Sequence, residues 1–368
     1  MIDEELTAKP VLSQVEGNAN PKTISGVVAK NFRPYEKSQK WNYNMTTKSS
    51  DTNARPVGRD TIRSRLVLEV ASEMVDQADW PNRQARVSLR PQGGEQWTVN
   101  MIASDGPAAL EQVARGEMQL AISNPAMYLA LALRGTGPYK KPIALRAITI
   151  IPSPDQLAFA VTEKTGVKSL HDIREQRLPL RLSLRGQKDH ALHPVVNEVL
   201  AVVGFSLDDI VSWGGQVFYD DGLPIKDNRL GAMLRGEVDM IVDEAVRGWA
   251  NQALDAGMRI LPLDEAMLTH LEALGLRRAV MPVARYPKLG KDLPTLDFSG
   301  FAVYTHADVP DEVITSICAA LEARKDRIGW QEPGPLPLER GCRDTPDGPL
   351  VIPLHPAAEK FWRGRGYL

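Results

Sequence analysis

A charged loop at positions 185–190 has the residue types of an anion-binding site. The segment LPLRLSLRG predicts a strand that ends in this loop, and KDHALHP predicts the start of the following helix. Backbone N–H groups at a helix N-terminus attract anions, and Arg or Lys adds charge-assisted hydrogen bonds to a carboxylate. The candidate ligand-binding residues here are Arg185, Gln187, Lys188 and His190. A solvated basic loop without a ligand is the alternative.

A second group of polar residues follows the apolar segment EVDMIV. It comprises Asp243, Glu244 and Arg247. Asp243 could cap the next helix, and Arg247 could either pair with Glu244 or reach a ligand carboxylate. Trp213 and Trp249 are candidate aromatic walls of a binding cleft, with core packing as the alternative.

Two earlier positions also have side chains or backbone suited to ligand contact. Ser123 and Asn124 follow the apolar segment EMQLAI, where one of them is expected to cap a helix and both could donate to a ligand. Gly94, beside Gly93, permits close approach of the backbone in the turn that precedes Glu95.

Signatures of catalysis and of cofactor binding are missing from the sequence. It contains no G-x-S-x-G, Walker loop, H-E-x-x-H or helix-opening G-x-G-x-x-G, so we expect no cofactor. His190, His193 and Asp189 lack a further clustered ligand, so we expect no metal. An enzyme remains the alternative, in which His190, Lys188, Asp243 and Glu244 carry out acid–base chemistry on a small carboxylate, as in a decarboxylase or lyase.

A repeated unit supplies the elements that position these residues. Residues 110–122 (LEQVARGEMQLAI) and 230–242 (LGAMLRGEVDMIV) each read as a helix, then Arg-Gly-Glu, then a short apolar strand. Gly116 and Gly236 stand where a helix ends in a residue of positive φ. Ligands of open α/β sheets bind beyond the carboxyl ends of the strands, so two such units predict two α/β lobes facing one cleft.

Composition describes an ordinary globular protein and excludes several partners. The 368 residues are 43% hydrophobic and 24% charged, with a net charge of −2, which gives no basic field for nucleic acid. The sequence has no run of 18 apolar residues, so we expect no direct membrane insertion. Cys318 and Cys342 have neither metal nor redox spacing.

The chain divides by pattern into an extension and two lobes. Residues 1–59 are a polar N-terminal extension, expected to be poorly ordered, and Met45 is an alternative start. The extension has no apolar signal-peptide core. Helix and strand signals alternate from residue 60 onward, which predicts lobe 1 from 60–162 plus 259–368 and lobe 2 from 163–258.

An ordered series of segments resembles the TAXI-type solute receptors of TRAP transporters. These segments are GGEQW, ARGEMQLAISNPAMY, LRAITIIPSPDQLAFAVTEKTGVKSLHDIREQRLPLRLSLRG, LRGEVDMIVDEAV, RILPLD and PLHPAAEKFWRGRGY, which together span about residues 60–368. The resemblance implies a two-lobed type II periplasmic binding-protein-like fold: α/β, with two mainly parallel sheets flanked by helices and a hinged cleft between them. It also implies that the turn at Gly94 and Glu95 lies beside the ligand.

The same resemblance implies a function. The chain would be a periplasmic receptor that captures a small organic anion and presents it to TRAP membrane permease subunits. Two departures from the family pattern affect this expectation, because the loop after the first strand of lobe 2 is RGQKDHALHP and the segment after the second repeat is the charged DEAVRGW. A cytoplasmic enzyme or ligand sensor on the same fold is therefore the alternative.

Overall fold

The computed structural model describes residues 59–76, 84–90, 98–104 and 106–368. These residues belong to two units, Met1–Ser72 and Glu73–Leu368. The first unit contributes most of helix α1 (Arg59–Asp76), which confirms the helix predicted from residue 60 onward. Apart from Arg59, the predicted polar extension lies outside the described residues. Within the described ranges, no helix has the length and apolar character needed to cross a bilayer.

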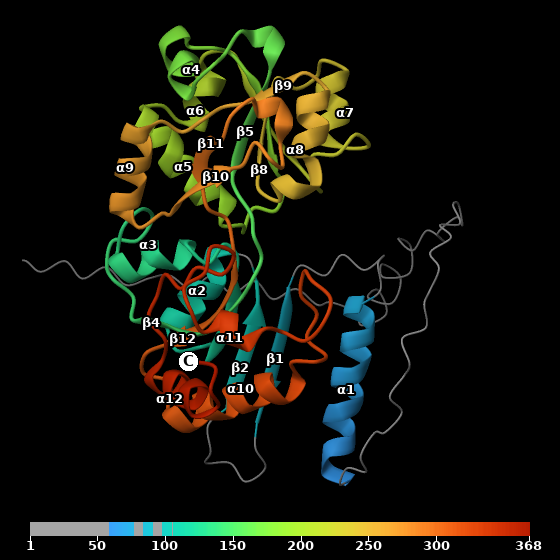
Figure 1. Ribbon diagram of the computed structural model, residues 1–368, viewed down its shortest axis with the longest axis vertical. Coiled ribbons are helices and arrows are strands. Elements are labelled where there is room, and N and C mark those ends of the chain that lie inside the picture. The colour runs from blue at the N-terminus through green and yellow to red at the C-terminus, as the bar shows by residue number, and fades with distance from the viewer. Residues whose placement is uncertain (1–58, 77–83, 91–97, 105) are drawn as a thin grey trace, which may run out of the picture. The chain divides into compact units, whose positions relative to one another are not determined.

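The first sheet of the second unit has five strands and is covered by helices on both faces (Figure 1). Its helices α2 and α3 pack on one face, and α10 and α12 pack on the other. The strand order is β1 (Ala85–Leu89), β2 (Val99–Ala103), β3 (Leu120–Ser123), β12 (Phe301–His306) and β4 (Leu145–Ile151). The helices are α2 (Pro107–Ala114), α3 (Tyr128–Arg134), α10 (Asp311–Arg324), α11 (Leu338–Gly341) and α12 (Pro356–Gly364).

The second sheet also has five strands between helices. Helix α5 packs on one face, and α8 packs on the other through the buried Trp249. The strand order is β7 (Gln216–Asp220), β6 (Arg181–Arg185), β8 (Met240–Asp243), β5 (Ala158–Thr162) and β9 (Met258–Ile260). The remaining elements here are η1 (Glu163–Thr165), α4 (Leu170–Gln176), α5 (Leu192–Val203), α6 (Leu207–Ser212), α7 (Arg229–Leu234) and α8 (Val246–Asp255).

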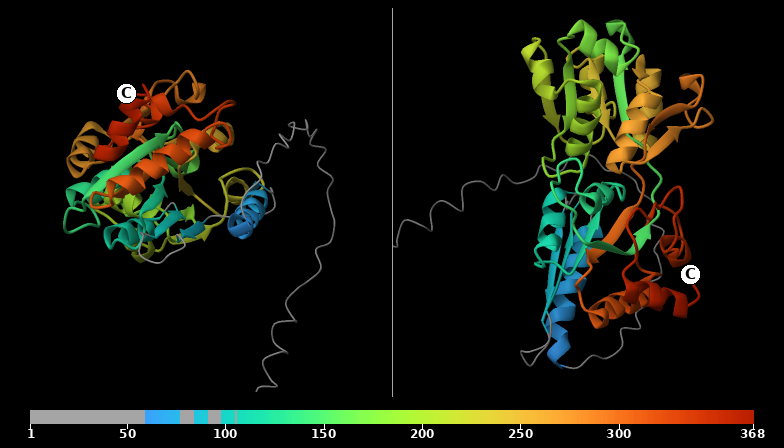
Figure 2. Two further views of the ribbon diagram at one scale, coloured as in Figure 1. Left: turned by 90° about the horizontal axis from the view of Figure 1, so that it is seen from below. Right: turned by 90° about the vertical axis from the view of Figure 1, so that its left-hand side faces the viewer.

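Two extended segments, 152–157 and 297–300, carry the chain between the sheets (Figure 2). They run antiparallel and are hydrogen-bonded to each other: Phe298 N donates to Asp155 O at 3.0 Å, and Gly300 N donates to Ser153 O at 2.9 Å. Before the return crossing the chain forms α9 (Glu265–Leu274) and a hairpin of β10 (Arg278–Met281) and β11 (Leu293–Leu296) that contains η2 (Pro287–Leu289).

The strand pairing changes two expectations from the sequence. Strand β5 pairs with β8 and β9, so residues 158–162 belong to the second sheet although their pattern placed them in lobe 1. The bounds given for the two lobes remain a prediction. The expected α/β fold of two helix-flanked sheets is confirmed, but the sheets are mixed and not mainly parallel. The reason is that β5 and β12 each begin at a crossing segment and run away from it. Their neighbours, β8 beside β5 and β4 beside β12, end on that side and therefore run in the opposite direction.

Both copies of the repeated unit are confirmed. Gly116 follows α2 with a φ of 72°, and Gly236 follows α7 with a φ of 74°. In each copy the preceding Arg pairs with the following Glu, and the chain then enters β3 or β8. Strand β3 ends at Ser123 and β8 ends at Asp243. The repeat therefore places these two residues at the end of each sheet where the crossing segments connect.

Candidate functional site

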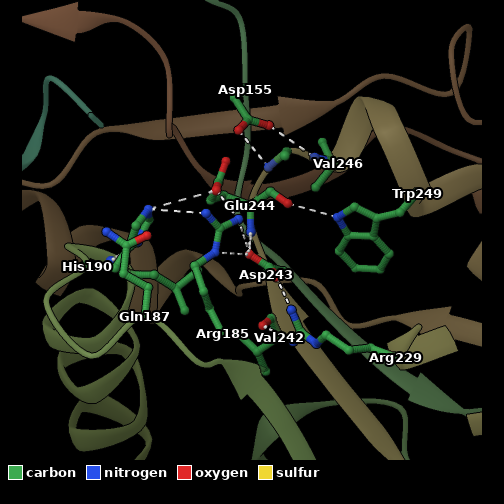
Figure 3. A network of polar contacts seen from close by, with 12 residues as sticks. Asp155, Arg185, Gln187, His190, Arg229, Val242, Asp243, Glu244, Val246 and Trp249 are labelled. Atoms are coloured by element: carbon green, nitrogen blue, oxygen red, sulfur yellow. Dashed lines mark hydrogen bonds and ion pairs between the residues drawn. The ribbon is translucent and has the colours of Figure 1, made fainter. Parts of the chain in front are cut away.

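The carboxyl ends of β6 and β8 bring the main group of charged residues together (Figure 3). These strands are parallel neighbours, with Leu182 opposite Met240. Arg185 is the last residue of β6 and Asp243 is the last residue of β8. The two predicted groups of polar residues, 58 positions apart in the chain, therefore form one site.

Asp243 is a buried carboxylate held between two arginines. Arg185 donates to its Oδ1 through Nε at 3.1 Å and Nη2 at 2.8 Å, and Arg229 Nη1 contacts its Oδ2. The backbone N–H of Glu244 also donates to Oδ1, at 2.9 Å. Burial lowers the pKa of Arg229, and the adjacent Asp243 opposes that change. Asp243 thus has its oxygens occupied by the protein and serves to orient Arg185.

Glu244 and Asp155 form a buried carboxyl pair next to this group. Burial, and then the hydrogen bond to Asp155, raise the pKa of Glu244 well above its usual range. Arg185 contacts Glu244 and opposes the rise, but burial and the second carboxyl outweigh it. Burial also raises the pKa of Asp155, against the backbone donors Ala245 N at 2.6 Å and Val246 N at 3.1 Å. The hydrogen bond between the two carboxyls raises the pKa of Glu244 and lowers that of Asp155, so Glu244 is the weaker acid of the pair.

His190 completes the buried polar network. Its Nδ1 accepts a hydrogen bond from Leu192 N at 3.1 Å. Nε2 lies 3.3 Å from Arg185 Nη1 and 4.0 Å from Glu244 Oε1. His193 instead contacts Gln187 O at 2.9 Å. Among the residues that the structure describes, no three His, Cys, Asp or Glu side chains are grouped to hold a metal ion.

A cavity of about 580 Å³ opens onto this network between the ends of the two sheets. Five predicted site residues line it: Asn124, Arg185, His190, Glu244 and Arg247. A neighbouring cavity of about 450 Å³ shares Arg185, Leu223 and Phe301 with the first and adds Gln187. Arg247 is exposed and makes no ion pair within the described part of the chain. The structure therefore places two arginines of different character, one buried and paired and one exposed, on the same cavity.

Several predicted residues have roles other than those expected. Ser123 and Asn124 do not cap α3, whose N-cap is Met127. Asn124 Nδ2 instead donates to the carbonyls of Phe298 at 3.3 Å and Gly300 at 3.2 Å, because the return crossing segment lies against it. Asp243 does not cap α8, since Asp155 accepts the N–H groups at the start of that helix.

Five further predicted residues lie off the main cavity or outside the described part of the chain. Lys188 is exposed and lines neither cavity, whereas His190 and Glu244 of the same catalytic hypothesis line the main one. Trp213 packs on Phe205 with ring centroids 5.7 Å apart, at the end of α6. Trp249 is a core residue whose Nε1 donates to Glu244 O at 2.8 Å. Gly94 and Glu95 lie outside the described residues.

Sequence reasoning missed Asp155, Arg229 and Phe301. Asp155 stands in a Ser-Pro-Asp segment whose sequence is typical of a turn. Arg229 is the first residue of the short helix α7, and its sequence context does not distinguish it from an exposed arginine. The only local signal for Arg229 is a basic residue at the N-terminus of a helix, where cations are unfavourable unless a carboxylate compensates them.

Comparison with known proteins identifies the family. The model of the NMT1-like family matches residues 86–366. No curated protein gives a significant match. Similar solved structures include an ancestral arginine-binding protein bound to arginine, at 13% identity and a TM-score of 0.29, covering 60% of this chain and 71% of that one. Another is the periplasmic aliphatic sulphonate binding protein SsuA from Escherichia coli, at 16% identity and 0.29, covering 60% and 56%.

A third similar structure is the glycine/betaine/L-proline-binding protein ProX from Borrelia burgdorferi, at 7% identity and a TM-score of 0.36, covering 58% of this chain and 66% of that one. This chain thus spans little more than half the length of SsuA and about two thirds of ProX. At these TM-scores nothing about ligands is transferred from any of the three. The family match, in contrast, extends over most of the chain, and the protein belongs to the NMT1-like family.

Proposed function

We propose that this protein is a solute-binding receptor that captures a small organic anion, bearing a carboxylate, between its two sheets. The observation that carries the proposal is the position of two arginines, Arg185 and Arg247, in the lining of one cavity. The guanidinium of Arg185 donates hydrogen bonds, as a ligand carboxylate requires, whereas the hydrogen bond between Glu244 and Asp155 uses the proton of that carboxyl pair. Exposed Arg247 on the same cavity adds attraction for an anion.

The charges of the buried groups support an anionic ligand. Arg185 and Arg229 both pair with Asp243, and the raised pKa of Glu244 reduces the negative charge beside them. Arg247 then leaves a positive charge at the cavity. An approaching carboxylate therefore meets hydrogen-bond donors without an opposing net negative charge.

Hinge closure is the proposed mechanism of capture. The paired segments 152–157 and 297–300 are the connections that would bend, and a ligand touching both sheets would favour the closed form. In this proposal the closed receptor presents its ligand to TRAP membrane permease subunits from the periplasm, as in the TAXI family. The permease class and the compartment follow from the resemblance of the sequence segments.

A matched pair of arginine variants tests the carboxylate site. Arg185→Gln should weaken binding of a carboxylate identified by thermal-shift screening by about 10- to 150-fold, as expected for a charged hydrogen bond. Arg181→Gln is the control, because Arg181 stands on the same strand but pairs with Asp239 away from both cavities. Equal affinities in isothermal titration of the two variants would contradict the proposal.

The permease partner needs a separate experiment. Uptake of the identified ligand into proteoliposomes that hold a TRAP permease should depend on added receptor. Uptake that is the same with and without the receptor would argue against TRAP delivery while leaving ligand binding intact.

A second candidate is an enzyme or sensor acting on a small carboxylate, and one observation favours it. Glu244 combines a raised pKa with a cavity position beside His190, an arrangement suited to proton transfer. Mass spectrometry of the ligand after incubation separates the two functions. A receptor returns the compound intact, and an enzyme returns it altered.

A further inference from the structure

An apolar cavity of about 470 Å³ lies next to the polar site on the side of the first sheet. Its lining contains no charged residue: Ile122, Ile151, Pro152, Phe301, Gly329, Trp330 and Gln331. Ile122 comes from β3, Ile151 ends β4 and Phe301 begins β12, so this lining is the cavity-facing end of the first sheet. The second sheet contributes none of these residues.

Shared residues join the apolar cavity to the other two. Phe301 lines all three cavities. Gln331 is common to the apolar cavity and the main polar one, and Ile122 is common to the apolar cavity and the third. The three cavities are therefore neighbours around Phe301, two of them polar and one apolar.

Trp330 gives the apolar part a fixed wall. Its Nε1 donates to Gly334 O at 3.1 Å, and the guanidinium of Arg340 lies 5.6 Å from the ring centroid. These contacts hold the indole in place while the ring stays only partly buried. A preformed aromatic wall binds an apolar group with little loss of conformational freedom.

We propose that the solute is an amphipathic monocarboxylate whose aryl or alkyl portion lies against Phe301 and Trp330. This rests on the proposed function, since the carboxylate end is assigned to Arg185. A dicarboxylate of the same length would place its second charge against an apolar wall without a partner, which is costly. The ligand would thus bridge the two sheets with its charged end on one and its apolar end on the other.

Isothermal titration of the wild-type protein with graded ligands tests the proposal. The series is acetate, butyrate, hexanoate, phenylacetate and 3-phenylpropionate, with succinate and adipate as dicarboxylates of matched length. Affinity should rise about fourfold for each methylene that enters the apolar cavity. The monocarboxylates with tails should bind more tightly than the dicarboxylates.

Two variants of Trp330 test whether the added affinity of the tailed monocarboxylates comes from contact with this residue. Trp330→Ala should lower the affinity for 3-phenylpropionate at least tenfold and leave that for acetate unchanged, and Trp330→Phe should retain most of the affinity. Trp213→Ala is the matched control, because Trp213 is equally half-buried but lines none of the three cavities.

The possible failures are distinguishable. Dicarboxylates that bind as well as the tailed monocarboxylates, or tails that add no affinity, would overturn the inference and leave the receptor proposal standing. If the affinity gained from the tail is retained in Trp330→Ala, the tail binds elsewhere, and this result would also overturn the inference. Binding of no carboxylate at all would remove the proposed function together with the inference.

Discussion

Arg229→Met should strongly destabilise the protein, because it leaves a buried carboxylate with less compensation. Arg229 is 1% exposed, and besides contacting Asp243 it donates to Ser183 Oγ at 2.8 Å and to Ser183 O at 2.9 Å. Removing one partner of a buried ion pair costs about 3–5 kcal/mol. Asp243 keeps Arg185, and methionine fills much of the volume, so we expect the lower half of that range.

Urea denaturation of the full chain, followed by circular dichroism, measures this change. Arg235→Met is the matched control: it stands six residues later at the end of the same helix, pairs with Glu237 in solvent and should leave the midpoint unchanged. The double variant Arg229→Met/Asp243→Asn should recover about 0.5–3 kcal/mol relative to the sum of the single changes. A loss below about 1 kcal/mol for Arg229→Met would refute the reasoning about the buried charge.

Two further changes test the raised pKa of Glu244 and the hydrogen bond that Asp189 forms between the two sheets. Burial and Asp155 raise the pKa of Glu244 in the folded protein. The contribution of Glu244 to stability is therefore present at low pH and is lost as the pH rises from about 4.5 through the raised pKa. The slope of this loss is up to about 1.4 kcal/mol per pH unit. Glu244→Gln should flatten this part of the curve in denaturation experiments at several pH values, and an unchanged slope would assign it to another group. Asp189 Oδ1 accepts from Ala108 N at 3.3 Å, which connects the loop before α5 to α2 of the first sheet. Asp189→Ala should speed ligand dissociation about two- to tenfold in stopped-flow measurements, whereas the exposed Asp326→Ala should not; equal rates would contradict a role for this contact in closure.

Local patterns in the sequence determined the repeated unit and the ends of its strands. Gly116 and Gly236 adopt positive φ because each ends a helix whose chain must turn at once into a strand. The apolar runs before Ser123 and Asp243 were sufficient to predict β3 and β8. Strand ends in turn predicted Arg185, Asp243 and Glu244 as site residues, and the structure brings these three side chains together.

Features that depend on distant contacts could not be predicted in this way. Residues 280–298 read as an irregular Pro-rich segment, yet they include β11 and part of β10, whose pairing satisfies the backbone of both. The expected caps at Asn124 and Asp243 failed because other segments supply or use the hydrogen bonds. A local pattern contains no information about these hydrogen-bond partners, which lie 174 residues away for Asn124 and 90 residues away for the start of α8.

The tertiary structure alone decided the chemical character of the site. Arg185 looked like a free cation in a basic loop, but Asp243 and Glu244 occupy it once β6 and β8 lie side by side. Glu244 looked like an ordinary acid, but burial beside Asp155 raises its pKa well above the usual range. The sequence determined which groups reach the strand ends, whereas their charge states depend on burial and on neighbours that only the folded chain supplies.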